Sequence, residues 1–271
     1  MYDFQYHRPA SLADAAKLLQ SAGDDGKLMA GGQTLIPTLK QRLAQPSAVI
    51  DLGGIKDLAG IKVDGNAVMI GALTTHSTVA SSKDVAGKIK ALAQLAEGIG
   101  DRQVRHCGTI GGSIANNDPA ADYPAAVLAL NATITTNQRK IAADEFFKGL
   151  FETALKPGEI ITSVSFPVPE KAAYVKFPNP ASRYAIVGVF VARFGSGGTG
   201  GGVRVAVTGA GQGGVFRAHK IEEALSKNFS AKAIEGLHPP ASSLNGDIHA
   251  SAEYRSHLIG VMAKRAVAAA G

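Results

Sequence analysis

The chain has 271 residues, 45% of them hydrophobic and 18% charged, which is enough apolar content for one large or two smaller domain cores. Its single cysteine, Cys107, excludes an internal disulfide. One thiol also cannot hold an iron–sulfur cluster or a structural zinc ion, because those need several ligands. The net charge of +6 comes from 28 scattered Lys and Arg residues, a distribution that disfavours nucleic-acid binding and favours an acidic protein partner.

The first residues, Met1 to Phe4, lack the zones of a signal peptide, and no apolar run reaches the roughly 18 residues of a membrane span. We therefore expect a cytoplasmic protein with no membrane span. The seven histidines show no metal-binding spacing, so no metal site is expected in this chain.

The first half of the chain mixes helices and strands. Ser11 is a predicted N-cap for a helix over residues 11–19. Strands are predicted at residues 27–30 and 48–52, and Asp64-Gly65 between alternating residues predicts a hairpin over 61–70. Apolar residues at helical spacing predict further helices, at residues 88–99 and 123–130.

The second half is dominated by strands until its end. Strands are predicted at residues 159–166, 174–177, 185–194 and 203–208, and helices at 221–227 and 252–269. Pro178-Asn179-Pro180 marks a predicted domain boundary. The glycine run 195–202 lacks the Lys-Ser/Thr of a phosphate-binding P-loop and indicates a flexible hairpin loop instead.

Two glycine-rich segments are candidates for binding an anion. Ala30-Gly-Gly-Gln-Thr-Leu35 follows a predicted strand, and paired glycines allow a sharp turn that brings successive N–H groups to a pyrophosphate. The second segment runs from Gly108 to Asp122 and adds a further glycine pair and two carboxylates, Asp118 and Asp122. Those carboxylates either cap a helix and a turn or accept hydrogen bonds from sugar or ribityl hydroxyls.

Together these segments resemble the FAD-binding medium subunit of the molybdenum hydroxylases, the family of xanthine dehydrogenase and aerobic carbon monoxide dehydrogenase. The resemblance covers essentially the whole chain. It depends on four motifs: Ala30–Leu35, Thr109–Ser113 with Asn116–Asp122, Lys156-Pro-Gly-Glu-Ile-Ile161, and Ala206-Val-Thr-Gly-Ala210.

The resemblance implies an α+β fold of the vanillyl-alcohol-oxidase (PCMH) type. The FAD-binding domain would span residues 1–177, with subdomains at about 1–56 and 57–177. Residues 178–271 would form a small α+β domain, the C-terminal flavoprotein domain of the carbon monoxide dehydrogenase type.

It also implies the site residues. The first cofactor loop would be Leu28, Met29, Ala30, Gly31, Gly32, Gln33, Thr34 and Leu35; the second, Thr109, Ile110, Gly111, Gly112 and Ser113, would hold the pyrophosphate through backbone N–H groups. Asp122 would hold a cofactor hydroxyl with help from Asp118, Ile161 would pack on the flavin, and Lys176 would approach the ring or its entrance. Gln33 and Ser113 stand where relatives often carry Thr or His, and Asn, respectively, and the resemblance implies main-chain contacts at both positions.

The function implied is electron transfer within an oxidoreductase complex, with no catalytic side chain in this chain. Non-covalent FAD would take electrons from the [2Fe–2S] clusters of a small subunit and pass them to NAD, a quinone, oxygen or a cytochrome. A large subunit would carry a molybdenum-pterin cofactor and the organic substrate's site, and the assembly expected is a dimer of heterotrimers.

Other functions stay open on the sequence. Gly209-Ala-Gly-Gln-Gly-Gly214 has the spacing of a nicotinamide dinucleotide fingerprint, although Val215–Arg217 looks extended rather than helical. Gly111–Ala115 is close to a serine hydrolase elbow, with Ser113 as nucleophile and Asp247 and His249 or His257 downstream. A Cys107–His106 pair is disfavoured because neighbours on an extended segment point to opposite sides. A scaffold that has lost FAD is the last alternative.

Overall fold

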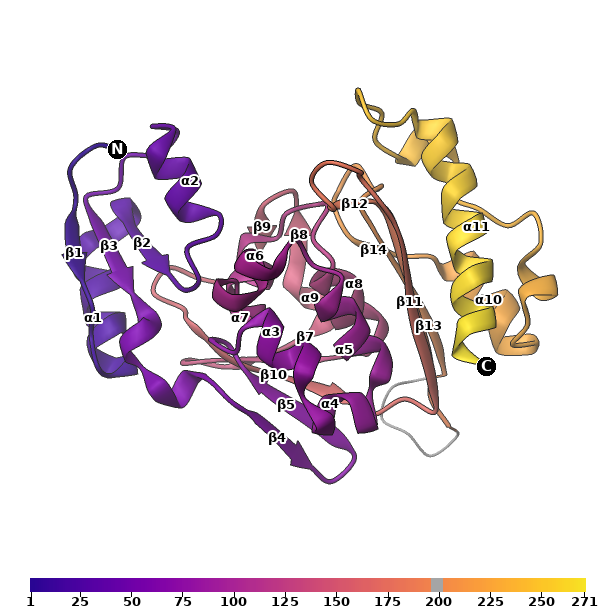
Figure 1. The fold of residues 1–271 in the computed structure, drawn as a ribbon, viewed down its shortest axis with the longest axis horizontal. Helices are drawn as coiled ribbons and strands as arrows, with labels where there is room; N and C mark the ends of the chain where they lie inside the picture. Colours follow the sequence, from indigo (N-terminus) through magenta and orange to yellow (C-terminus); the bar gives the residue numbers. More distant parts are fainter. Residues whose placement is uncertain (196–201) are drawn as a thin grey trace.

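The computed structural model describes residues 1–195 and 202–271, and its chain folds into three layers side by side (Figure 1). The N-terminal layer is a parallel sheet in the order β1 (Gln5–His7), β3 (Ala48–Asp51), β2 (Gly26–Met29), with helices α1 (Leu12–Ala22) and α2 (Leu35–Lys40). The Oγ of Ser11 accepts a hydrogen bond from the Asp14 N–H at 3.1 Å, which confirms the predicted N-cap of α1.

The middle layer is an antiparallel sheet in the order β4, β5, β10, β6, β7, covered by short helices (Figure 1). The hairpin predicted at Asp64-Gly65 is confirmed, because Asp64 pairs with Ala67 and Gly65 has a φ of 56°. The strands are β4 (Ile61–Asp64), β5 (Ala67–Gly71), β6 (Thr133–Thr136), β7 (Lys140–Ala142) and β10 (Ile161–Pro167). The helices are α3 (His76–Ser81), α4 (Lys83–Lys88), α5 (Lys90–Glu97), α6 (Arg102–Cys107), α7 (Ile110–Asn116), α8 (Tyr123–Ala129) and α9 (Ala143–Phe146), and a hairpin joins β8 (Phe147–Gly149) to β9 (Glu152–Thr153).

The helix predicted over residues 88–99 is interrupted at Ile89. That residue has φ −139° and ψ 71°, so α4 ends before it and α5 begins after it. Burial explains the interruption: Ile89 is 2% exposed and belongs to the central core, so the chain bends to keep its side chain there. The apolar spacing identified the segment but could not show this break.

The C-terminal layer is an antiparallel sheet in the order β11 (Lys171–Pro178), β12 (Ala185–Arg193), β13 (Val203–Thr208), β14 (Phe216–Arg217). Helix α11 (Ala252–Ala270) lies against β11 and β12, and α10 (His219–Lys227) lies against β13. Of the predicted glycine loop, residues 196–201 lie outside the described residues. Short 3-10 turns occupy Gly23–Asp25, Leu52–Gly54, Lys56–Leu58, Ala231–Ile234 and Ala241–Ser243.

Strand β11 bears on the expected domain boundary. It pairs with β12 along its length, from Lys171 opposite Arg193 to Pro178 opposite Ala185, so the expected boundary at 177/178 falls at the end of a strand of the C-terminal sheet. We propose instead that the boundary lies between β10 and β11, because the two strands belong to different sheets. Of the Pro-Asn-Pro segment that suggested this boundary, Pro178 ends β11, and Asn179-Pro180 begins the connection between β11 and β12.

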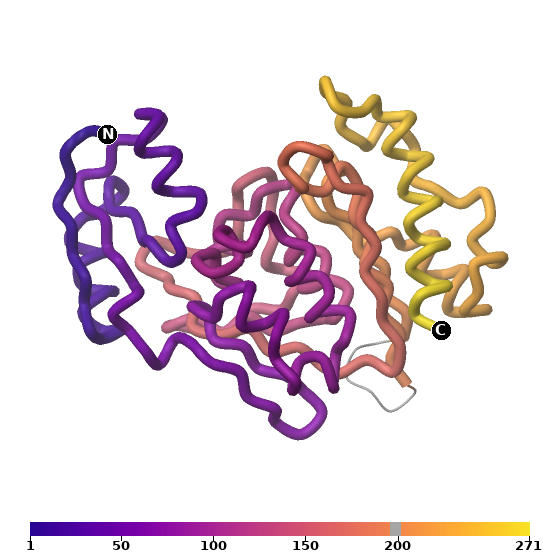
Figure 2. The backbone as a smooth tube through the Cα atoms, viewed as in Figure 1, coloured from indigo at the N-terminus to yellow at the C-terminus, as the bar shows by residue number. Residues whose placement is uncertain are grey.

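The central strand β12 explains how the layers hold together. Val187, Val189 and Val191 belong to the core shared with α11, whereas Phe190 and Ala192, which point to the other face, belong to the core of the middle layer. Both faces of β12 are therefore covered, which is why its sequence is a continuous apolar run rather than an alternating pattern. Figure 2 shows the resulting chain path, with the two termini on opposite sides of the molecule.

None of the helices in residues 1–195 and 202–271 has the length and apolar character needed to cross a membrane.

Candidate cofactor-binding site

A cavity of about 1020 Å³ lies where the N-terminal and middle layers meet the loop between β11 and β12. Ligand pockets typically measure about 300–1,000 Å³, so this one can enclose a ligand of dinucleotide size. All of the site residues expected from the sequence line it, except Ile110 and Lys176. Segments far apart in the sequence thus form one site: residues 28–35, 108–122, 159–161 and 181–184 all reach the cavity.

The first loop presents unused hydrogen-bond donors to this cavity. It follows β2 and turns at Gly32, whose φ of 70° is in the region that favours glycine. Among the described residues, no group accepts a hydrogen bond from the N–H of Gly31, Gly32, Gln33 or Thr34. Successive free N–H groups around a glycine turn form a concave site for an anion, so this loop has the geometry of a pyrophosphate cradle.

Gly31 is required by packing between the two loops. A Cβ at this position would lie 2.0 Å from the carbonyl oxygen of Cys107 and 2.8 Å from Cα of Gly108. No side chain fits there, because both neighbours are backbone atoms. The first glycine of the pair therefore allows the loop to contact the end of α6, and Gly32 allows the turn.

The second loop differs from the expected N–H cradle. It forms the start of helix α7, and the N–H groups of Ile110, Gly111 and Ser113 donate to the carbonyl oxygens of Thr74, Ala72 and Thr109. The Gly112 N–H donates to Oγ1 of Thr109, the N-cap, at 3.2 Å. The expected backbone contact is therefore not available from residues 110–113. The donors left here are the N–H group of Thr109 and the hydroxyl groups of Thr109 and Ser113, which have no acceptor among the described residues.

Two residues of this loop are fixed by packing. A Cβ on Gly111 would lie 2.6 Å from Cβ of Ala72 and 2.7 Å from its oxygen, so this glycine permits α7 to contact the end of β5. Ile110 is fully buried in the central core, and it does not line the cavity. Its position as the first residue of α7 turns its side chain away from the site.

Asp122 lines the cavity, and its carboxylate is bound by two side chains of the C-terminal sheet. The Tyr174 hydroxyl donates to its Oδ1, and the Lys176 Nζ lies 3.0 Å from the same oxygen. Burial raises the pKa of this carboxyl, and the Lys176 charge and the Tyr174 and Lys176 hydrogen bonds oppose that rise. Its side chain does not cap α8, so the capping interpretation is wrong.

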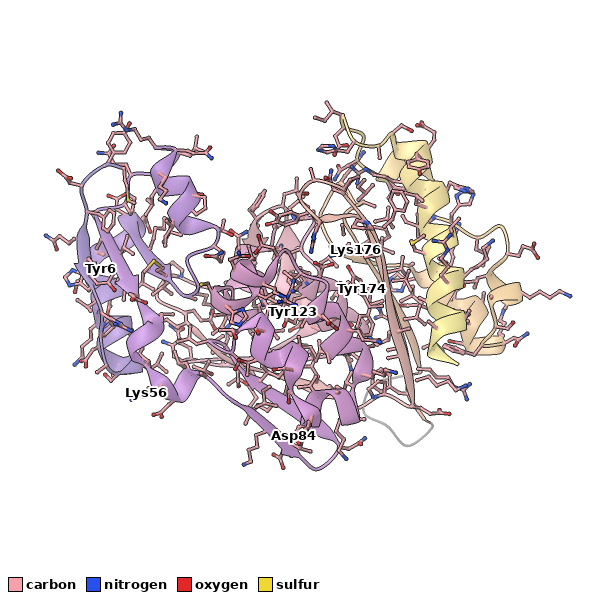
Figure 3. The ribbon with its side chains drawn as sticks, viewed as in Figure 1. Tyr6, Lys56, Asp84, Tyr123, Tyr174 and Lys176 are labelled. Carbon is pink, nitrogen blue, oxygen red and sulfur yellow. The ribbon has the colours of Figure 1, made fainter. Side chains whose placement is uncertain are left out.

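Lys176 lies beside Asp122. Its Nζ donates to the carbonyl oxygen of Gly98 at 2.8 Å and to Asp122, and the side chain is 11% exposed. The lysine does not line the cavity and reaches it only through Asp122. Figure 3 labels Tyr174 and Lys176 on the C-terminal sheet and Tyr123 on the middle layer.

Asp118 and Ile161 both line the cavity. Oδ1 of Asp118 accepts a hydrogen bond from the Ala120 N–H at 2.9 Å, which is the turn role that Asp beside Pro suggested. Its other carboxylate oxygen is available to a ligand. Ile161 begins β10 and is 5% exposed, so it offers an apolar wall.

Three aromatic residues of the cavity had no signal in the sequence patterns. Tyr184 lies on the loop between β11 and β12, and burial together with the charges of Asp118 and Asp122 raises the pKa of its hydroxyl. Phe151 lies at the tip of the β8–β9 hairpin. His76 begins α3 and is 5% exposed; burial, helped by the charge of Arg105, lowers its pKa to about 4, so its ring is neutral at pH 7. All three reach the cavity through tertiary contacts alone.

The rival functions do not fit this geometry. Ser113 lies inside helix α7 rather than at a strand-to-helix elbow, and the ring of His249 faces the Asn179 amide at 3.3 Å instead of a serine. The glycines at 209–214 lead into β14, which pairs antiparallel with β13, and not into the helix that a dinucleotide fingerprint needs. Residues 102–107 form a helix rather than an extended segment, and Nδ1 of His106 lies 2.7 Å from the Arg102 carbonyl oxygen, so no Cys–His pair forms.

Comparisons with known proteins agree with this arrangement. Residues 2–169 match the family described as FAD binding domain in molybdopterin dehydrogenase, and residues 172–270 match the CO dehydrogenase flavoprotein C-terminal domain. The carbon monoxide dehydrogenase medium chain of Afipia carboxidovorans is 37% identical, with 97% of this chain and 95% of the relative covered. The nicotine 6-hydroxylase medium subunit of Paenarthrobacter nicotinovorans is also 37% identical, with 98% and 97% covered.

A solved structure extends the likeness to the whole fold. Reconstituted CO dehydrogenase from Oligotropha carboxidovorans contains a chain that matches with a TM-score of 0.89 and 34% identity, covering 99% of this chain and 98% of that one. The two matched families abut between β10 and β11. This chain therefore belongs to the family of FAD-binding medium subunits of the molybdenum hydroxylases, the flavoprotein components of carbon monoxide dehydrogenase-like oxidoreductases.

Proposed function

We propose that this chain relays electrons through FAD held in the cavity, from the [2Fe–2S] clusters of a small partner subunit to a soluble acceptor. The observation that supports it most directly is the first loop, whose four consecutive free N–H groups face a cavity of dinucleotide size. FAD, when bound, supplies the redox chemistry, and the protein supplies binding, orientation and electrostatics.

The residues of the cavity divide the binding of FAD among them. The N–H groups of residues 31–34 would hold the pyrophosphate, and the hydroxyls of Thr109 and Ser113 would donate to it from the opposite wall. Asp122 has free lone pairs on its carboxylate beyond those used by Tyr174 and Lys176, so it can accept a hydrogen bond from a ribityl or ribose hydroxyl. Ile161 would pack against a flat apolar surface of the cofactor.

The charge around Asp122 determines what that residue can do. A lone buried carboxylate would take up a proton, because burial penalises its charged form. Lys176 opposes this by offering a positive charge 3.0 Å away. Asp122 would act as a hydrogen-bond acceptor toward FAD, and Lys176 as a residue that positions its carboxylate rather than one that contacts the ring.

The chain itself is suited to receive electrons from elsewhere. Its single cysteine cannot ligate a cluster, and no group of three or more metal-ligating side chains occurs among the described residues. The clusters and a molybdenum-pterin cofactor would accordingly belong to a small and a large subunit, in a dimer of heterotrimers. The net charge of +6 would favour an acidic face on one of these partners.

The organic substrate would be determined by the large subunit. The relatives of this chain at equal identity are named for carbon monoxide and for nicotine, although their medium chains align with it over nearly their full length. The acceptor would be NAD, a quinone, oxygen or a cytochrome, since any of these can take electrons from a flavin at the mouth of the cavity.

Flavin retention is the first measurement. The purified full chain is incubated with FAD, desalted, and examined for the visible flavin absorption bands and their bleaching by dithionite. Retained, reducible flavin supports the site; a chain that retains no flavin alone and yields no extractable flavin when co-purified with its partner subunits contradicts it. Asp122→Asn serves as the matched variant, because it removes the charge and keeps the shape.

The relay is tested in the complex. Partner subunits are purified with the chain, and the reduction of the acceptor is followed with FAD-loaded and FAD-depleted preparations in the presence of the complex's substrate. Acceptor reduction that disappears on FAD removal and returns with added FAD supports the relay. Equal rates in both preparations would show that electrons leave the complex by another route.

A further inference from the structure

The tip of the β8–β9 hairpin carries two exposed apolar residues that face different ways. Phe151 is 60% exposed and lines the cavity, whereas Leu150 is 47% exposed and does not. The Leu150 side chain lies toward the turn at Gly214, where a Cβ would be 4.0 Å from its Cδ2. The hairpin therefore presents one aromatic ring to the cavity and one aliphatic side chain to the C-terminal layer.

The backbone at Phe151 is strained. Its φ is 57°, in the left-handed region that bulky residues rarely adopt. A residue held there is destabilising and persists only where its surroundings fix it, typically at ligand clamps and other functional sites. A glycine at this position would avoid the strain. The side chain at position 151 therefore occupies the cavity wall at an energetic cost to the fold.

Asn117 fixes the hairpin tip to helix α7. Its side-chain Nδ2 donates to the carbonyl oxygens of Gly149 at 2.8 Å and Glu152 at 2.9 Å. Its main-chain carbonyl oxygen accepts a hydrogen bond from the Phe151 N–H at 3.2 Å. Asn117 is 2% exposed and is the C-cap of α7, the helix that begins with the second loop. These bonds hold Phe151 in fixed register with that loop.

We propose that Phe151 is a ring-stacking residue for FAD, clamped in place by Asn117. The ring has no aromatic partner among the described residues, yet it is exposed at the wall of a cavity that takes a cofactor with two planar ring systems. Stacking on the cofactor would bury the apolar face of the Phe151 ring, which the fold leaves exposed, and would explain why a strained backbone is kept at this position. The inference relies on the FAD site proposed above.

Both ring systems of FAD offer the same flat aromatic surface. The position of Phe151 beside the C-terminal end of α7, rather than beside the first loop, places the contact at one end of the cofactor. Binding of two fragments then identifies the ring: FMN carries the isoalloxazine without the adenine, and ADP carries the adenine without the isoalloxazine.

The test is FAD binding by the full chain, measured by titration for wild type, Phe151→Ala and Phe151→Tyr, with Leu150→Ala as the matched control. Stacking of an aromatic side chain on a planar base, transferred to this site, predicts that Phe151→Ala weakens FAD binding by about 5- to 100-fold. Phe151→Tyr should keep the wild-type affinity, and so should Leu150→Ala. Wild-type FAD affinity in Phe151→Ala would overturn the proposal, whereas absence of FAD binding by the wild-type chain, both alone and with its partner subunits, would overturn the FAD site.

Phe151→Gly separates a ligand-binding role from a structural one. Removing the strain should raise the midpoint of thermal unfolding of the ligand-free chain, while FAD affinity falls as in Phe151→Ala. A merely structural residue would not give these opposite signs. The proposal would be contradicted if Phe151→Gly lowered both the unfolding midpoint and the FAD affinity while Phe151→Ala left the FAD affinity unchanged.

Asn117→Asp tests the clamp, because it keeps the shape and removes both amide donors. It should weaken FAD binding when Phe151 is present and have little further effect in a chain that already carries Phe151→Ala. Additive losses would contradict the positioning role.

A loss of affinity by Phe151→Ala that is shared by FMN identifies the isoalloxazine as the stacked ring, and one shared by ADP identifies the adenine.

Discussion

Lys176 on β11 of the C-terminal sheet lies 3.0 Å from Asp122 at the floor of the cofactor cavity, although 53 residues lie between them in the sequence. The same Nζ donates to the carbonyl oxygen of Gly98, just beyond α5. One side chain thus ties the C-terminal domain to two segments that line or adjoin the cavity. This explains why the C-terminal domain belongs to the site even though it supplies few of the cavity's residues.

Replacing Lys176 with Met should change how stability depends on pH. Burial already raises the pKa of Asp122 in the folded state, so the folded chain holds this proton more tightly than the unfolded chain. Its contribution to stability is present below the unfolded pKa of about 3.9 and is lost as the pH rises through the folded pKa. Without Lys176 that folded pKa rises further, and urea unfolding should show a larger destabilisation of Lys176→Met at pH 8 than at pH 5.

The control for this prediction is Lys176→Met combined with Asp122→Asn. The neutral amide cannot titrate, so the extra pH dependence should disappear. If Lys176→Met destabilises the chain equally at pH 5 and pH 8, the ion pair between Lys176 and Asp122 does not contribute to stability.

The adjacent glycines of the second loop should behave differently. Gly111→Ala places a Cβ within 2.6–2.9 Å of Ala72 and should lower the free energy of unfolding by about 1–3 kcal/mol, as overpacking does. Gly112→Ala meets only Thr109 Oγ1 at 3.0 Å and Ala30 Cβ at 3.5 Å. Because it fills space between the two loops, it should weaken FAD binding with a smaller change in stability.

Chemical unfolding and FAD titration of both variants check this contrast. Equal effects of the two alanine variants on stability would show that the packing at Ala72 relaxes to accept a side chain.

Ser113→Ala should weaken FAD binding by about 0.5–1.5 kcal/mol, since it removes one neutral hydroxyl donor from the cavity wall. The fold should be unaffected, because the Ser113 hydroxyl has no partner among the described residues. Isothermal titration with FAD measures the loss. Ser81→Ala is the matched control: that hydroxyl donates to the Ser77 carbonyl on α3, outside the cavity. Unchanged affinity in Ser113→Ala would leave the pyrophosphate to the first loop and the Thr109 hydroxyl.

His76 should make the chain sensitive to acid. Its folded pKa is lowered to about 4 by burial, below the ordinary value of about 6.5, so the unfolded chain binds its proton more tightly. Stability contributed by the neutral ring is therefore lost as the pH falls from about 6.5 toward 4. Unfolding free energies measured between pH 7 and pH 5 should fall less steeply in His76→Gln than in wild type.

The exposed His257 on α11 gives the matched control, His257→Gln, which should keep the wild-type slope. A wild-type slope in His76→Gln would show that other groups cause the acid sensitivity.

The local sequence determined much of the fold. Ser11 predicted an N-cap and Asp64-Gly65 a hairpin, because each depends on hydrogen bonds or backbone angles within a few residues. The two glycine-rich segments indicated the family and much of the cavity wall. They could do so because two backbone segments that approach closely need glycine at the contact, and the sequence shows the glycines directly. The sequence did not predict the interruption of the helix at Ile89 or the full length of β11, because core packing and strand pairing determine these features.

Only the tertiary structure decided which donors and charges meet in the site. The N–H groups of the second loop donate to Ala72 and Thr74, residues some 36 to 39 positions earlier, so the sequence could not show that they are unavailable to a ligand. Likewise, Lys176 pairs with Asp122, and Asn117 holds Phe151, across sheets and hairpins that bring distant segments together. Motifs report what a short segment can do by itself, whereas hydrogen-bond saturation, burial and ion pairing depend on which segments the fold places side by side.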